Sequence, residues 1–77
     1  MITNVTNMIA YIWFIIRDYH ASTYSLKTVC NIAVEQLRKD GYTVETGKQG
    51  NLTVNGIPYR IFKTPGWNSY DVRNTGI

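Results

Sequence analysis

The sequence predicts a small α+β domain: two N-terminal helices packed on a three-stranded antiparallel β-meander, followed by an aromatic C-terminal tail or short extra strand. Three features favour this fold. No glycine or proline occurs before Gly41, so the chain up to Asp40 is free to form helices. After Gly41 the apolar residues change from helical spacing to alternation. Asn55-Gly56 then separates two alternating segments, which is the strongest short signal for a β-hairpin.

The first predicted helix covers about residues 5–19. Asn4, Thr6 and Asn7 offer N-cap oxygens, and apolar residues recur behind them at helical spacing. Residues 8–16 carry no polar side chain other than a Tyr hydroxyl. A strand stays open as an alternative there, because Ile, Trp, Tyr and Phe favour strands. As a helix this run would measure about 14 Å against a hydrocarbon core of about 30 Å, so no membrane association is expected.

Four apolar side chains of this helix fall outside its main stripe, namely Tyr11, Trp13, Phe14 and Ile15. A small domain rarely wraps a helix that is apolar nearly all round. We therefore expect this surplus face to contact a second copy of the chain or a partner protein. The alternative, of equal weight, is a central helix packed between the sheet and the second helix.

The second predicted helix covers about residues 25–40. Ser25 can cap it, and Gly41 follows as a stop signal. One face is apolar and the other carries charges that solvent exposure explains. His20 lies in the polar link between the helices, where a lone histidine is far more often solvated than catalytic.

The β-meander is predicted over about residues 42–63, with a turn at residues 47–50. A two-residue loop at Asn55-Gly56 places Leu52 opposite Tyr59 and Val54 opposite Ile57 on one apolar face. The helices should cover that face. Pro58 cannot donate to a β-ladder, so its position should lie at an unpaired or non-hydrogen-bonded site.

The C-terminal segment, residues 64–77, begins with a Pro65-Gly66 turn and is either a short strand or an extended tail. We interpret Trp67 as a lid on the open end of the core, the usual role of a large amphipathic ring near a chain end.

Composition and motifs argue against an enzyme. One Cys and one His give no internal disulfide and too few soft ligands for zinc or an iron–sulfur cluster, so no metal site and no cofactor are predicted. No phosphate-binding loop, nucleophile elbow or metalloprotease motif occurs, and the five carboxylates belong to different elements, so no catalytic residue is assigned.

The residues from Met1 to Asn7 carry no Lys or Arg, so no secretory signal is expected and the chain reads as cytoplasmic. At 77 residues the chain buries a modest core, which usually needs help from a disulfide, a metal or another subunit. A homodimer is therefore expected. We also expect a phage or mobile-element origin.

Two binding functions remain. The preferred one is a protein-binding module, an inhibitor or adaptor, because the chain has six Tyr and two Trp but only 17% charged residues. The alternative is nucleic-acid binding, since the net charge is +3 and cations interleave with rings along the hairpin and tail. The candidate binding residues for either partner are Lys48, Arg60, Phe62, Lys63, Trp67, Tyr70 and Arg73.

Overall fold

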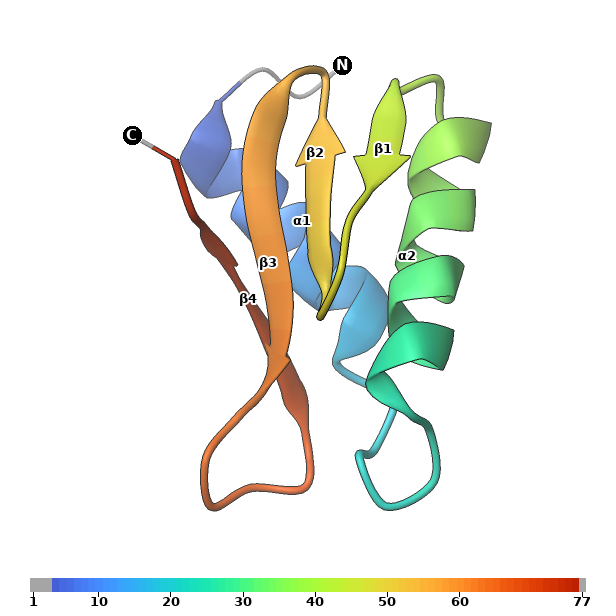
Figure 1. The fold of residues 1–77 in the computed structure, drawn as a ribbon, viewed down its shortest axis with the longest axis vertical. Helices are drawn as coiled ribbons and strands as arrows, with labels where there is room; N and C mark the ends of the chain where they lie inside the picture. Colours follow the sequence, from blue (N-terminus) through green and yellow to red (C-terminus); the bar gives the residue numbers. More distant parts are fainter. Residues whose placement is uncertain (1–3, 77) are drawn as a thin grey trace.

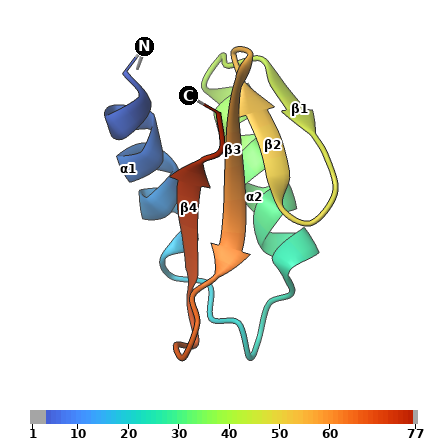
Figure 2. The same ribbon diagram turned by 60° about the vertical axis from the view of Figure 1, so that its left-hand side comes forward.

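Two helices pack on one face of a four-stranded antiparallel sheet in the computed structural model, which describes residues 4–76 (Figures 1 and 2). The strands follow one another in sequence order across the sheet. Helix α1 lies mainly beside β4, whereas α2 packs on β1 and β3. The elements are α1 (Val5–Ile16), α2 (Leu26–Lys39), β1 (Val44–Thr46), β2 (Asn51–Val54), β3 (Ile57–Lys63) and β4 (Tyr70–Asn74).

Helix α1 begins at a capped N-terminus, as its sequence predicts. The side chain of Asn4 accepts hydrogen bonds from the backbone N–H groups of Thr6 and Asn7, at 2.8 and 3.2 Å. Met8, Ile12 and Ile16 recur every four residues and are buried. The helical interpretation of residues 8–16 is therefore right and the strand alternative is wrong. The helix ends at Ile16, earlier than expected, because the chain turns there and the Tyr19 N–H bonds to the Ile16 carbonyl.

Helix α2 also matches its predicted cap and stripe. Ser25 Oγ accepts from the Thr28 N–H at 3.2 Å, and Arg38 and Lys39 occupy the last turn, where cations favour the helix dipole. Gly41 follows with φ 98°, the left-handed conformation that commonly ends a helix. The local sequence was sufficient to set both ends of this helix.

The β2–β3 hairpin has the predicted register, with Leu52 opposite Tyr59 and Val54 opposite Ile57. Asn55 and Gly56 have φ angles of 51° and 83°, as a two-residue turn of the primed type requires. Pro58 lies where β4 ends. Its carbonyl accepts from the N–H of Thr75 at 3.1 Å, so the position of the missing N–H falls beyond the β3–β4 ladder.

The three-stranded meander with a tail is a prediction that needs correction, because residues 70–74 form the fourth strand. Strand β4 pairs with β3 from Lys63 opposite Tyr70 to Tyr59 opposite Asn74. Along it, Tyr70 and Val72 are buried, while Asp71 and Arg73 face the other side. This alternation lets the strand complete the apolar face of the sheet. The short-strand alternative is therefore the right one.

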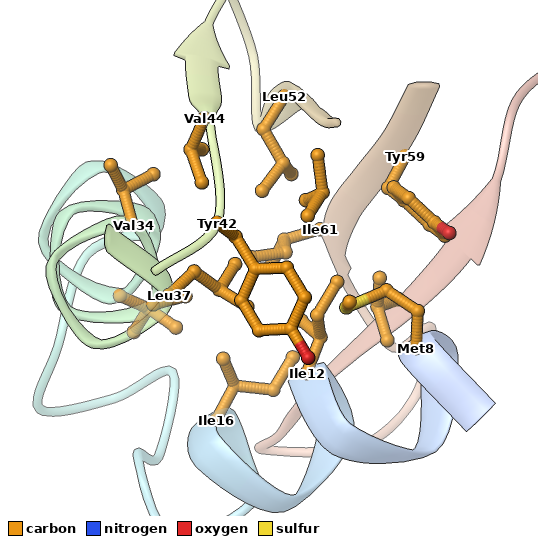
Figure 3. Packing of buried hydrophobic residues seen from close by; sticks show 14 of the residues in the cluster. Met8, Ile12, Ile16, Val34, Leu37, Tyr42, Val44, Leu52, Tyr59 and Ile61 are labelled. Carbon is orange, nitrogen blue, oxygen red and sulfur yellow. The ribbon is translucent and has the colours of Figure 1, made fainter. Parts of the chain in front are cut away.

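The core lies between the helices and the inner face of the sheet (Figure 3). Ile12 and Ile16 of α1, Leu37 of α2 and Ile61 of β3 have no exposed surface, and Tyr59 is 1% exposed. No buried residue among residues 4–76 is polar or charged. Apolar packing is therefore the main stabilising interaction between the two layers.

Candidate functional site

Large apolar side chains remain exposed at one end of the molecule. Among residues 4–76 the exposed fractions are 41% for Trp13, 60% for Phe14, 37% for Tyr24 and 70% for Trp67. Trp13 and Phe14 belong to the last turn of α1, Tyr24 to the α1–α2 link, and Trp67 to the β3–β4 hairpin. The link and the hairpin project from the same end of the fold, at the bottom of Figure 1. We call Trp13, Phe14, Arg17, Tyr24 and Trp67 the aromatic end.

Hydrogen bonds hold the link and the hairpin together. The amide side chain of Asn68 accepts from the Ser22 N–H at 2.6 Å and donates to Ser22 Oγ at 2.8 Å. Behind them the Tyr70 hydroxyl donates to the Tyr24 carbonyl at 2.7 Å. Two loops that are far apart in sequence therefore present their aromatic residues in one fixed arrangement.

Arg17 organises the rings of α1. Its guanidinium lies 4.4 Å from the centroid of Phe14 and 5.6 Å from that of Trp13, and the two rings meet edge to face at 6.1 Å. Each cation–π contact at an exposed position stabilises by about 0.5–1 kcal/mol. Trp13 and Phe14 are therefore held in a preferred orientation while they stay exposed.

A hollow of about 270 Å³ lies between α1 and the β3–β4 hairpin. Trp13 and Arg17 line it from the helix, and Trp67 and Asp71 line it from the hairpin and the start of β4. The hollow thus combines two indole rings, one cation and one carboxylate. Trp67 is not a lid on the core, because most of its ring faces solvent beside this hollow.

The four residues of the predicted surplus face divide into two pairs. Trp13 and Phe14 are exposed, whereas Tyr11 and Ile15 pack partly buried against the core. The Tyr11 hydroxyl donates to the carboxylate of Asp40, which caps α2. Tyr11 therefore joins the two helices within one chain.

Three of the predicted binding residues gather on the outer face of the sheet, which neither helix covers. Arg60 of β3 lies directly opposite Arg73 of β4, and the Arg73 guanidinium is 5.5 Å from the Phe62 ring centroid. Arg60 Nε also donates to the Gln49 carbonyl at 3.2 Å. The register places Glu45 and Asp71 on the same face, but among residues 4–76 neither carboxylate forms an ion pair with these two arginines.

The other four predicted binding residues lie elsewhere. Lys48 is in the β1–β2 turn, and Lys63 Nζ donates to the Trp67 carbonyl at 3.1 Å at the hairpin end. Tyr70 is 5% exposed and belongs to the core. The structure thus separates Trp67 from the outer-face arginines and brings it instead to the hollow shared with Trp13.

Burial raises the pKa of three groups, all outside the aromatic end. They are the Cys30 thiol and the hydroxyls of Tyr59 and Tyr70, and the neighbouring Cys30 thiolate raises the pKa of Tyr70 further. Each shift keeps the group neutral over a wider pH range. Within residues 4–76, no three His, Cys, Asp or Glu side chains meet in a way that could hold a metal ion. No helix in that part of the chain is long and apolar enough to cross a membrane.

Sequence reasoning missed two parts of the site. Arg17 follows Phe14 by three residues and Trp13 by four, a helical spacing that brings side chains together and could have indicated the contact. The link between Asn68 and Ser22 joins residues 46 positions apart and leaves no local signal.

No protein-family model matches the chain, and no curated protein or solved structure matches it either. Function is therefore inferred from the geometry of the site.

Proposed function

We propose that this protein is a small, non-enzymatic protein-binding module, an inhibitor or adaptor, that docks through its aromatic end. The convergence of Trp13 and Trp67 on one hollow, from opposite ends of the chain, carries the proposal. Trp and Arg are enriched among the few residues that contribute most of the binding energy of a protein interface. Hydrogen bonds between the two loops fix the rings before binding, which lowers the entropic cost of association.

Charge favours a protein partner over a nucleic acid at this surface. Arg17 Nε lies 3.9 Å from the Asp18 carboxylate, and Asp71 lines the same hollow as Arg17. A nucleic-acid surface concentrates positive charge in order to neutralise several phosphates. The balanced charge at the aromatic end is typical of the rim of a protein interface.

We propose that a second copy of the chain can dock on the same hollow, so that the dimer and a complex with another partner would exclude each other. A two-fold pairing brings each surface patch against itself, so a group can meet its complement on the other copy. Arg17 and Asp71 line the same hollow with opposite charges. In such a dimer Arg17 of each copy would face Asp71 of the other, with the indole rings between them.

Light scattering coupled to size exclusion tests this pairing. We expect a dimer mass for the wild-type chain at micromolar concentration, and a monomer mass for Trp13→Glu, which removes the indole ring from the contact and gives Arg17 a carboxylate partner within its own chain. Buried aromatic anchors often contribute about 2 kcal/mol or more, so the dissociation constant of the dimer should rise roughly thirtyfold or more. Thr6→Glu, exposed at the other end of α1, is the matched control and should leave the mass unchanged. A wild-type monomer at every concentration would overturn the pairing.

Nucleic-acid binding is the second candidate, favoured by one feature of the outer face. Arg60 and Arg73 are direct cross-strand neighbours, a like-charge arrangement that costs stability unless an anion lies between them. The same light-scattering experiment, repeated with a random single-stranded oligonucleotide at low and then physiological salt, separates the two functions. A salt-dependent gain in mass would overturn the protein-binding proposal and assign the outer face to nucleic acid.

A further inference from the structure

The edge of β1 that does not pair with β2 faces helix α2. The Gly47 N–H donates to the Asn51 carbonyl at 2.8 Å, and the Asn55 N–H donates to the Thr43 carbonyl at 2.7 Å. The backbone groups of residues 43, 45 and 47 therefore form the hydrogen bonds to β2. Because these groups alternate along an antiparallel strand, the backbone groups of Val44 and Thr46 must point away from β2.

The two residues on this edge differ in whether they have a partner. Arg38 Nη2 of α2 donates to the Val44 carbonyl at 2.8 Å and closes one end of the edge. The N–H and C=O of Thr46 have no hydrogen-bond partner among residues 4–76. The opposite edge of the sheet differs, because the Asp71 carboxylate there accepts from the outward N–H of Val72 at 2.8 Å. Thr46 therefore offers an unpaired donor and acceptor side by side.

A hollow of about 470 Å³ lies beside Thr46, between α2 and the β1–β2 hairpin. Leu26, Cys30 and Val34 of α2 and Leu52 of β2 give it an apolar lining. Lys27 is the charged residue in its rim. The volume lies in the range of about 300–1,000 Å³ that is typical of ligand sites.

We propose that this groove binds a short, extended peptide segment of a partner protein. One residue of the peptide pairs with Thr46, exchanging both backbone hydrogen bonds as a hydrogen-bonded pair of antiparallel strands does. An apolar side chain of the peptide fills the hollow between Leu26, Val34 and Leu52. An acidic residue flanks it and faces Lys27. A peptide fits because its backbone supplies an acceptor for the Thr46 N–H and a donor for the Thr46 carbonyl, which a purely apolar ligand cannot do.

This groove is independent of the aromatic end. The lining residues come from α2 and the β1–β2 hairpin, whereas the aromatic end is built from α1, the α1–α2 link and the β3–β4 hairpin. A monomeric protein could still bind the peptide, and a dimeric one could still fail to. Failure of either proposal can therefore be told from failure of the other.

The experiment is an NMR titration of the isotope-labelled full chain with the acetylated and amidated peptide Glu-Val-Leu-Val-Glu. We expect shift changes at the amides of Thr46, Gly47 and Cys30, with none at Trp67. The same peptide with an N-methyl group on its central leucine cannot donate there, and should bind about tenfold more weakly. Equal affinity of the two peptides, shift changes at the aromatic end instead, or no binding at millimolar peptide would each overturn the proposal.

A pair of variants tests the role of Thr46. Thr46→Pro removes the outward N–H, a change that an edge strand tolerates, and should weaken peptide binding by about tenfold. Thr46→Val keeps the N–H and should bind as the wild type does. The amide spectrum outside β1 reports whether Thr46→Pro is folded. If Thr46→Pro is unfolded, the comparison of the two peptides on the wild-type chain tests the proposal. If Thr46→Pro is folded and binds the peptide with wild-type affinity, the proposal is overturned.

Discussion

Cys30, Tyr59 and Tyr70 share one physical feature, since packing in apolar surroundings raises the pKa of each. Desolvation disfavours the charged form, which for a thiol or a phenol is the deprotonated one. As pH rises, the unfolded chain therefore loses these protons before the folded chain does. The stabilisation is fully present below the unfolded pKa values, about 8.5 for Cys and 10 for Tyr, and is lost as pH rises through the higher folded values.

We therefore expect alkaline pH to destabilise the protein. The free energy of unfolding in urea should be level between about pH 7 and 8 and should fall above about pH 9. Cys30→Ala removes the thiol contribution and should delay the onset of the fall toward the tyrosine range. Alkylation of Cys30 by iodoacetamide should likewise reach half its maximal rate at a higher pH than alkylation of a free cysteine. A free energy of unfolding that rises above pH 9 would contradict this interpretation.

Two glycines show how a single backbone conformation serves different roles in different elements. Gly56, in the β2–β3 turn, has φ 83° and open space around the position of a β-carbon. Gly50, at the end of the β1–β2 turn, has nearly the same φ of 84°, but a β-carbon there would come within 2.0 Å of the Ile61 carbonyl oxygen. The Gly50 carbonyl also accepts from the Ile61 N–H at 2.9 Å, so the turn is held against β3 at the point where a side chain would intrude.

Alanine at the two positions should therefore cost different amounts of stability. Gly56→Ala should cost about 1–2 kcal/mol, the penalty for a left-handed residue with a β-carbon. Gly50→Ala adds a backbone collision and should cost about 3 kcal/mol or more, in the range of severe core defects. Chemical denaturation of both variants measures the difference. Equal costs would mean that the turn moves away from β3 without penalty.

At the scale of the whole molecule, the aromatic end depends on contacts between the first and last thirds of the chain. Helix α1 and the α1–α2 link supply Trp13, Phe14 and Tyr24, while the β3–β4 hairpin supplies Trp67. The side chain of Asn68 makes two of the hydrogen bonds that join these regions. Replacing Asn68 should therefore lower both the stability of the fold and the affinity of self-association.

Asn68→Ala should lower the free energy of unfolding by about 1–2 kcal/mol, as expected for two lost hydrogen bonds. It should also weaken self-association, because the hairpin is no longer fixed against the link and the rings must be ordered on binding. Denaturation and light scattering measure the two effects. Asn31→Ala, on the exposed face of α2, is the control and should change neither. If Asn68→Ala self-associates as strongly as the wild type, the hydrogen bonds between the link and the hairpin are not needed for dimer formation.

The predictable parts of this fold rest on residues close together in sequence. Asn4 and Ser25 cap their helices, and Asn55-Gly56 sets the register that places Leu52 opposite Tyr59. Each depends on spacing within one turn or one hairpin. The sequence identifies Trp13 and Phe14 as surplus apolar surface, but it places Trp13 and Trp67 on different predicted surfaces.

The two helices, their caps and buried stripes, and the central hairpin follow from the local sequence, because short-range hydrogen bonds and apolar periodicity select these elements. Residues 70–74 form a strand because the folded chain brings them to the edge of β3, and an isolated alternating segment would not form one alone. The tertiary structure also brought Trp13 to the same hollow as Trp67, and left Thr46 unpaired beside α2 while Arg38 engaged Val44. These outcomes depend on how distant segments pack, and packing selects among arrangements that the local sequence leaves equally open.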